Sequence, residues 1–386
     1  MRRWLCLYLC AAGWTAAQAW EERLTREGAF WLRTVRGAED VPARGELRVS
    51  ASGRVSLRGA PSAAAATYSF TIRVKAQTEE EARRLLGQPL VRTGRLHDVT
   101  LIEVIHGGIQ TSAELTVHAP ETLRAVRVET RGGAVEVAGF EGSAHLRTGG
   151  GRIRIDRVGG DVSARSAGGE ISLGAIGGAA HCVSAGGEIR AGQIGGAGRF
   201  ETAGGDIAIR EVRGPVTAST AGGGIQIQRA GASVEANTAG GEIRVGAAQG
   251  PVVAHTMGGP IFVGPAAGVR CESGGGAIEL VDAAGAVHAT TVVGSIVARL
   301  ARAAALEESS LTTGSGDITL WVPPSLGLLI QAQNRVAGGE RIVSEFPDLT
   351  IRRRGSLVIA EGLINGGGPL LRLAGAGGTI YIKRQR

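Results

Sequence analysis

The sequence predicts an all-β fold in which the chain winds into a single-stranded parallel β-helix, also called a β-solenoid. The main observation is the motif Thr-Ala-Gly-Gly-Glu-Ile, or a close variant, which returns about every eighteen residues between residues 130 and 318. The clean copies begin at Ser166, Ser184, Thr202, Thr220 and Thr238. A fixed period of this length is typical of solenoids, in which each repeat forms one coil. We expect about eleven coils, and base rates for parallel crossovers favour a right-handed winding.

The second observation is a set of apolar columns that appear when the repeats are placed in register. Each half of a repeat reads as a short strand with alternating apolar residues, followed by a turn that contains glycine. The first strand contributes the column Val135, Ile153, Ile171, Ile189, Ile207, Ile225, Ile243, Ile261, Ile278, Ile296 and Ile318. We expect these columns to face inward. We also expect the glycine pairs to form corners with positive φ, and the preceding Ser or Thr hydroxyls to satisfy the turns.

Composition supports an ordered, exported protein. The chain of 386 residues has 63 glycines but is 43% hydrophobic, and no Gly-X-Y triplets run through it, so collagen is excluded. Arg2 and Arg3, the apolar stretch 4–14 and the small residues Ala17 and Ala19 predict a signal peptide over residues 1–19. We therefore expect the periplasm, the cell surface or secretion, with no transmembrane segment after cleavage.

Charge distribution argues against a nucleic-acid partner. The chain carries 42 Lys and Arg against 35 Asp and Glu, and the basic residues are interspersed with the acidic ones. Binding to nucleic acid requires basic residues that gather in one patch or stripe. No nucleic acid is therefore expected among the partners.

The two ends of the chain depart from the repeat and predict caps. We expect an N-terminal β-rich cap domain over residues 20–119 with a helix near 78–86, solenoid repeats over 120–322, and C-terminal rungs and a cap over 323–386. Thr78 and Glu81 form a capping box at the start of the helix, and Gly87 ends it. Near the C-terminus, segments 365–373 and 379–383 resemble two final rungs. Caps are required because a terminal coil exposes unpaired strand edges.

The register also predicts the state of the two cysteines that follow the signal peptide. Cys182 and Cys271 occupy one inward column, five coils apart. At the ordinary strand spacing they lie roughly 24 Å from each other. A disulfide needs Cα atoms within about 7 Å. Both thiols are therefore expected to be free and buried.

One acidic row is the candidate for a ligand-binding site. Glu170, Glu188, Asp206 and Glu242 share one position of the repeat, which Gly224 interrupts. Carboxylates in adjacent coils could hold a divalent cation. A solvated row relieved by neighbouring arginines is the competing interpretation. We expect no catalytic residue, no metal site and no cofactor.

Both junctions of the repeat region resemble those of a known family. The segments are Leu115–Pro120 with Val128–Val135 at the first junction, Thr313–Pro323 at the second, and Asn365–Pro369 with Gly378–Ile382 near the C-terminus. They are similar to the bacterial "putative adhesin" family, over roughly residues 110–383. The resemblance implies a secreted or envelope-associated β-solenoid and supplies no functional residue.

The leading functional hypothesis is a non-enzymatic, adhesin-like or envelope scaffold that presents a rigid surface to an envelope polymer or a protein. One alternative is a cation-dependent carbohydrate-active enzyme on the β-helix, which would need a carboxylate pair or a metal site. The other is a solenoid that associates end to end through its terminal coils.

Overall fold

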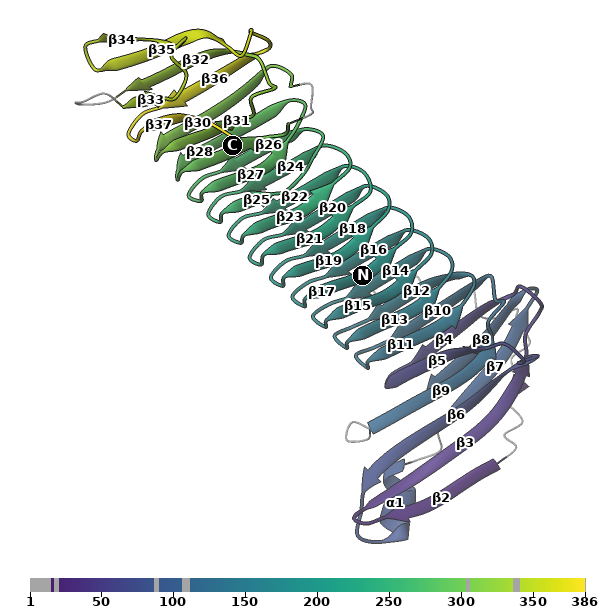
Figure 1. Ribbon diagram of the computed structural model, residues 1–386. Helices are drawn as coiled ribbons and strands as arrows, with labels where there is room; N and C mark the ends of the chain where they lie inside the picture. Colours follow the sequence, from purple (N-terminus) through teal and green to yellow (C-terminus); the bar gives the residue numbers. More distant parts are fainter. Residues whose placement is uncertain are drawn as a thin grey trace. The chain divides into compact units, whose positions relative to one another are not determined.

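A computed structural model describes residues 15–16, 21–86, 90–105, 112–302, 306–335 and 341–385. The chain divides into two compact units, Met1–Gly187 and Glu188–Arg386. The prediction of a β-solenoid is confirmed, because each unit consists mainly of short strands stacked in parallel in two sheets (Figure 1). Among the described residues, no helix has the length and hydrophobicity of a membrane span.

The first unit contains regular coils whose strands alternate between its two sheets. One sheet contains β10 (Ala125–Thr130), β12 (Ser143–Thr148), β14 (Val162–Ser166) and β16 (Ala180–Ser184). The other contains β11 (Val135–Phe140), β13 (Ile153–Val158) and β15 (Ile171–Ile176). Within the unit, consecutive strands of each sheet pair in parallel at a step of eighteen residues, so that Val135 lies opposite Ile153, and Ile153 opposite Ile171.

The N-terminal part of this unit is mostly antiparallel but also contributes coils. Its strands are β1 (Thr15–Ala16), β2 (Glu21–Glu27), β3 (Phe30–Asp40), β4 (Glu46–Ala51), β5 (Arg54–Ala60), β6 (Ala65–Lys75), β7 (Leu90–Leu96), β8 (Val99–Ile105) and β9 (Ser112–Pro120). β4 and β5 pair in parallel with β10 and β11 on one side, and with β8 and β9 on the other. The coil formed by β4 and β5 is therefore inserted between two coils that follow it in the sequence.

The helix lies where the sequence predicts it. α1 spans Glu79–Leu86, and the backbone N–H of Glu81 donates to Thr78 Oγ1 at 3.2 Å. The Glu81 carboxylate reaches back to the N–H of Gln77 at 2.9 Å, one residue earlier than an ideal capping box. Gly87, the expected stop, lies outside the described residues, as does the predicted signal peptide apart from residues 15–16.

The second unit continues the same pattern in its own coils. One sheet contains β18 (Gly198–Thr202), β20 (Val216–Thr220), β22 (Val234–Thr238), β24 (Val252–Thr256), β26 (Val269–Ser273), β28 (Val287–Val293) and β30 (Ser309–Ser315). The other contains β17 (Ile189–Ile194), β19 (Ile207–Val212), β21 (Ile225–Ala230), β23 (Ile243–Ala248), β25 (Ile261–Val263), β27 (Ile278–Ala283), β29 (Ile296–Leu300) and β31 (Ile318–Val322). The pairing is parallel throughout these strands.

At the C-terminal end of this unit the strands do not stack in sequence order, and we call this arrangement threaded. Its strands are β32 (Leu328–Arg335), β33 (Ile342–Ser344), β34 (Thr350–Arg354), β35 (Leu357–Ile364), β36 (Leu370–Gly375) and β37 (Ile380–Arg384). β36 pairs in parallel with both β30 and β32, and β37 with both β31 and β33. The predicted rungs are present as β36 and β37, but they are not the final ones. The chain returns after β35, so that β36 and β37 lie between the coil of β30 and β31 and the coil of β32 and β33.

The apolar columns form the core, as predicted. In the second unit the column from Ile189 to Ile318 keeps one register and is extended by Ile380 and Ile342 of the threaded end. These isoleucines are at most 2% exposed. Phe200 is completely buried in the neighbouring strand, and a Cβ at Gly198 would lie 2.6 Å from its ring. The ring of Phe200 therefore occupies the space that a side chain at residue 198 would need.

The corner glycines correct one expectation. None of the regular Gly-Gly pairs adopts a positive φ. The second glycine is required by a close approach instead. A Cβ at Gly241 would lie 2.0 Å from the carbonyl oxygen of Gly223 in the preceding coil, whereas a Cβ at Gly240 would meet nothing nearer than 3.6 Å. Coil stacking, rather than turn conformation, selects glycine at this position.

The Ser and Thr residues before each pair satisfy the corners, as expected. Thr238 is 4% exposed; its hydroxyl donates to the carbonyl of Gly223 at 2.9 Å and accepts from the N–H of Gly241 at 3.2 Å. The same pair of bonds recurs at Thr148, Ser166, Ser184, Thr220, Thr256 and Ser273. Each hydroxyl therefore ties its own corner to the preceding coil.

Replacing Thr238 by Val is expected to destabilise the second unit by about 2 kcal/mol, because two buried backbone groups lose their partner. Thr238→Ser is the matched control, since it keeps the hydroxyl and loses one methyl, at a cost of about 1 kcal/mol or less. Urea unfolding followed by circular dichroism measures both. Equal losses in the two variants would contradict a hydrogen-bonding role for this hydroxyl.

Candidate binding groove

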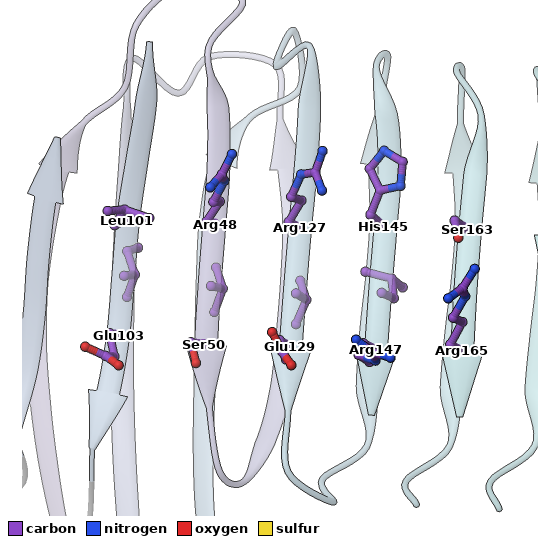
Figure 2. A pocket seen from close by; sticks show the side chains of 14 residues that line it. Arg48, Ser50, Leu101, Glu103, Arg127, Glu129, His145, Arg147, Ser163 and Arg165 are labelled. Carbon is purple, nitrogen blue, oxygen red and sulfur yellow. The ribbon is translucent and has the colours of Figure 1, made fainter. Parts of the chain in front are cut away.

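A shallow groove of about 540 Å³ lies on the outer face of the first unit, across β8, β4, β10, β12 and β14 (Figure 2). Two rows of outward side chains line it. The first row is Leu101, Arg48, Arg127, His145 and Ser163, and the second is Glu103, Ser50, Glu129, Arg147 and Arg165. We call the surface formed by these ten residues the arginine groove.

Strand alternation places these side chains on the outside. Leu47 and Val49, which flank Arg48, point into the core and are at most 2% exposed. Val126 and Val128 flank Arg127 in the same way. Since side chains alternate along a strand, the residues between apolar core positions face solvent. Parallel pairing in register then aligns them into straight rows across the strands.

A buried carboxylate positions the first row. Glu46 is 8% exposed, and its Oε1 accepts from Arg48 Nε at 2.6 Å and from Arg127 Nε at 2.7 Å. Burial alone would raise the pKa of Glu46, but the hydrogen bond and charge of Arg48, and then of Arg127, outweigh it and hold the pKa below its usual 4.5. Arg124 lies 3.9 Å from Glu46 and pairs with Asp98 at 2.7 Å.

Glu46→Gln is expected to lower the stability of the first unit by roughly 1–2 kcal/mol at pH 7, because two charge-assisted hydrogen bonds are weakened. The folded pKa is lower than the unfolded one, so the stabilisation is complete above the unfolded value of 4.5 and is lost as pH falls through the folded value. The difference between wild type and variant should therefore shrink below about pH 4.5. Urea midpoints from pH 3 to 7 measure this, and a constant difference would contradict it.

The second row contains two arginines without an acidic partner. Arg147 and Arg165 are directly opposite each other in adjacent strands, and both are exposed. Neither forms an ion pair with any residue that the structure describes. Glu129 precedes Arg147 in the row without making such a pair. A smaller recess of about 440 Å³ adjoins this end and adds Arg131.

His145 occupies the middle of the first row. Burial, and then the charge of Arg127, lower its pKa, while Glu46 and Asp161 act in the opposite direction. The net shift is downward, so the ring is neutral at pH 7 and can both donate and accept a hydrogen bond. The groove therefore combines fixed positive charges with neutral polar groups.

The acidic row that the sequence predicts is present, but its carboxylates already have partners within the protein. In the first unit, Glu170 pairs with Arg152 at 3.2 Å. In the second unit, Glu188, Asp206 and Glu242 line a recess of about 280 Å³ beside Gly224. Glu188 pairs with Arg190, Glu242 pairs with Arg244 at 2.5 Å, and Asp206 Oδ1 accepts the N–H of Gly224 at 2.8 Å. No group of three His, Cys, Asp or Glu within the described ranges has metal-binding geometry.

The two cysteines lie on inward positions of their strands. Cys182 is opposite Ala164, and Cys271 is opposite Ala254. Both are free and buried, and burial raises the pKa of both thiols, so neither is a nucleophile in the folded chain.

The arginine groove was missed by sequence reasoning, which placed β4 and β8 in a separate cap. A signal was available, since Leu47-Arg48-Val49 repeats the alternation of Val126-Arg127-Val128. The eighteen-residue step from Arg147 to Arg165 also predicts that they align. Only the non-sequential insertion of the β4–β5 coil brings the two halves of the groove together.

Comparison with known proteins gives structural likeness only. No family model matches the chain. No curated protein matches it either. A solved structure from Bacteroides fragilis described as a "putative adhesin" is 12% identical, with 69% of this chain and 96% of that chain covered and a TM-score of 0.31.

Two further solved structures are similar over most of both chains. A "putative cell adhesion protein" from Clostridium sporogenes is 8% identical, covers 91% of this chain and 99% of its own, and has a TM-score of 0.18. A "putative lipid binding protein" from Parabacteroides distasonis is 10% identical, covers 92% and 97%, and has a TM-score of 0.22.

Proposed function

We propose that the protein is a non-enzymatic, exported, adhesin-like scaffold whose coils present straight rows of polar side chains to an envelope polymer. The observation that supports this most is the arginine groove. Its side chains project from paired strands rather than from loops, so their spacing is fixed by backbone hydrogen bonds. A pre-organised surface of this kind binds with little loss of conformational entropy.

The described residues favour binding over catalysis. A cation-dependent glycan-cleaving enzyme would need carboxylates available to a metal or to substrate. In the acidic row, Glu170, Glu188 and Glu242 pair with arginines and Asp206 accepts a backbone N–H. These carboxylates therefore form ion pairs and hydrogen bonds within the coils.

The test is co-sedimentation of the purified full chain with isolated cell-envelope polysaccharide, followed by measurement of polymer length. We expect saturable binding without shortening of the polymer, with or without a chelator. Glu188→Ala should leave both results unchanged. Depolymerisation that disappears with chelator or in Glu188→Ala would overturn the proposal in favour of the enzyme, and the absence of binding to any envelope fraction would overturn it altogether.

A further inference from the structure

The arginine groove carries two guanidinium groups that form no ion pair with any residue that the structure describes. Arg147 and Arg165 face solvent from directly opposed positions, at the strand spacing of about 4.8 Å. Like charges in directly opposed positions are destabilising. Together with Arg131 in the adjoining recess they place three arginines beside one acid, Glu129.

Several arginines elsewhere on the coils do have acidic partners. Arg199 pairs with Glu201, two residues further along its own strand, at 2.5 Å. Arg229 pairs with Glu211 of the preceding coil at 3.1 Å. The positions two residues from Arg147 hold His145 and Gly149, and those two residues from Arg165 hold Ser163 and Ala167. In the preceding coil Arg165 has Arg147 opposite it, whereas Arg147 has Glu129 opposite it and forms no ion pair with it.

We infer that the arginine groove binds the carboxylate groups of an acidic polysaccharide, with Arg147 and Arg165 as the principal anion contacts; this rests on the proposed binding function and names its ligand class. A guanidinium fork bonds a carboxylate in a bidentate manner. The neutral groups in the groove, Ser50, Ser163 and His145, suit the hydroxyls of a sugar because each can donate and accept. The rows cross the strands in a straight line, which suits a linear polymer (Figure 2).

Other anionic ligands fit the lining less well. No Phe, Tyr or Trp is among the described residues that line the groove, so the large aromatic rings on which the bases of a nucleic acid usually stack are missing. The apolar residues Ile102, Val128 and Leu146 point into the core and are at most 3% exposed, so an acyl chain finds no apolar cavity. A carboxylated sugar polymer uses both the charges and the neutral polar groups.

The experiment uses polygalacturonate as the probe and compares it with methyl-esterified polygalacturonate and with polyphosphate. Binding of the purified full chain is measured by calorimetry at two salt concentrations. We expect the esterified polymer, which keeps the sugars and loses the charges, to bind at least about tenfold more weakly. Equal binding of the esterified polymer, or tighter binding of polyphosphate, would overturn the assignment to carboxylates.

Two double variants localise the site. Arg147→Gln with Arg165→Gln should weaken polygalacturonate binding at least about tenfold, because two charge-assisted contacts are lost. Arg199→Gln with Arg270→Gln removes the same charge from exposed strand positions of the second unit and should change binding by less than about twofold. Equal losses would indicate diffuse attraction and overturn the site. Glu129→Gln removes the competing carboxylate and should strengthen binding by about threefold.

The two proposals fail in different ways. If the chain binds envelope polysaccharide and the Arg147→Gln, Arg165→Gln variant binds it equally well, the adhesin-like function stands and this site is wrong. If neither envelope fractions nor polygalacturonate bind, the adhesin-like function itself is wrong. Circular dichroism of each variant excludes a loss of fold as the cause.

Discussion

Replacing Gly169 by Ala is expected to destabilise the first unit by about 3 kcal/mol, near the upper end for added bulk in a packed structure. A Cβ at this position would lie 2.0 Å from the carbonyl oxygen of Gly151 and 2.4 Å from its carbonyl carbon. Both are backbone atoms. The adjacent bond from the N–H of Ile153 to the carbonyl of Glu170 measures 2.8 Å, so the coils cannot separate here without weakening the ladder.

The neighbouring glycine supplies the control. A Cβ at Gly168 would meet no atom within 4 Å, and its φ is not positive. Gly168→Ala should therefore change stability by no more than about 0.5 kcal/mol. Urea unfolding by circular dichroism distinguishes the two, and equal midpoints for Gly168→Ala and Gly169→Ala would contradict the close-approach explanation.

These two glycines illustrate what the sequence does and does not reveal. The period predicts the coil, because an apolar residue such as Ile171 must recur at one place to build a column. Both glycines of the pair recur with the same period, so the sequence does not distinguish them. Which of them is required depends on the distance between neighbouring coils, and that distance is a property of packing rather than of local turn preference. The expectation of positive φ came from turn chemistry and was wrong for this reason.

The non-sequential coils mark a second limit. The sequence predicts a β-rich domain over 20–119 and rungs at 365–373 and 379–383, and the structure has β4, β5, β36 and β37 there. The sequence does not show that β4 with β5, and β36 with β37, are inserted between coils from other parts of the chain. Strands that pair across a long connection are not separated by the eighteen-residue period, so the repeat does not reveal their pairing. The arginine groove depends on one of these insertions, since Arg48 meets Arg127 only when β4 pairs with β10. The candidate site was therefore less predictable than the fold.

The second large effect is expected at the threaded C-terminal coil, where Leu373→Asp should destabilise the end of the second unit by on the order of 4 kcal/mol. Leu373 is 1% exposed and lies between Leu311 of β30 and Ala332 of β32. An unpaired carboxylate there would disturb two strand interfaces at once. A coil at the outer end would have only one such interface and would lose less stability. A large loss of stability therefore indicates that the coil of β36 and β37 is inserted between two others.

Arg372→Gln is the matched control on the same strand. Arg372 faces outward and pairs with the exposed Glu308, so its loss should cost no more than about 0.5 kcal/mol. Limited proteolysis adds a regional readout: in Leu373→Asp, segments 328–335 and 357–364 should both become sensitive, because β32 loses its partner in β36 and β35 depends on β32. If proteolysis stays confined to the residues after 365, the coil is terminal rather than inserted. The threading would then be wrong even if the register of the remaining coils is right.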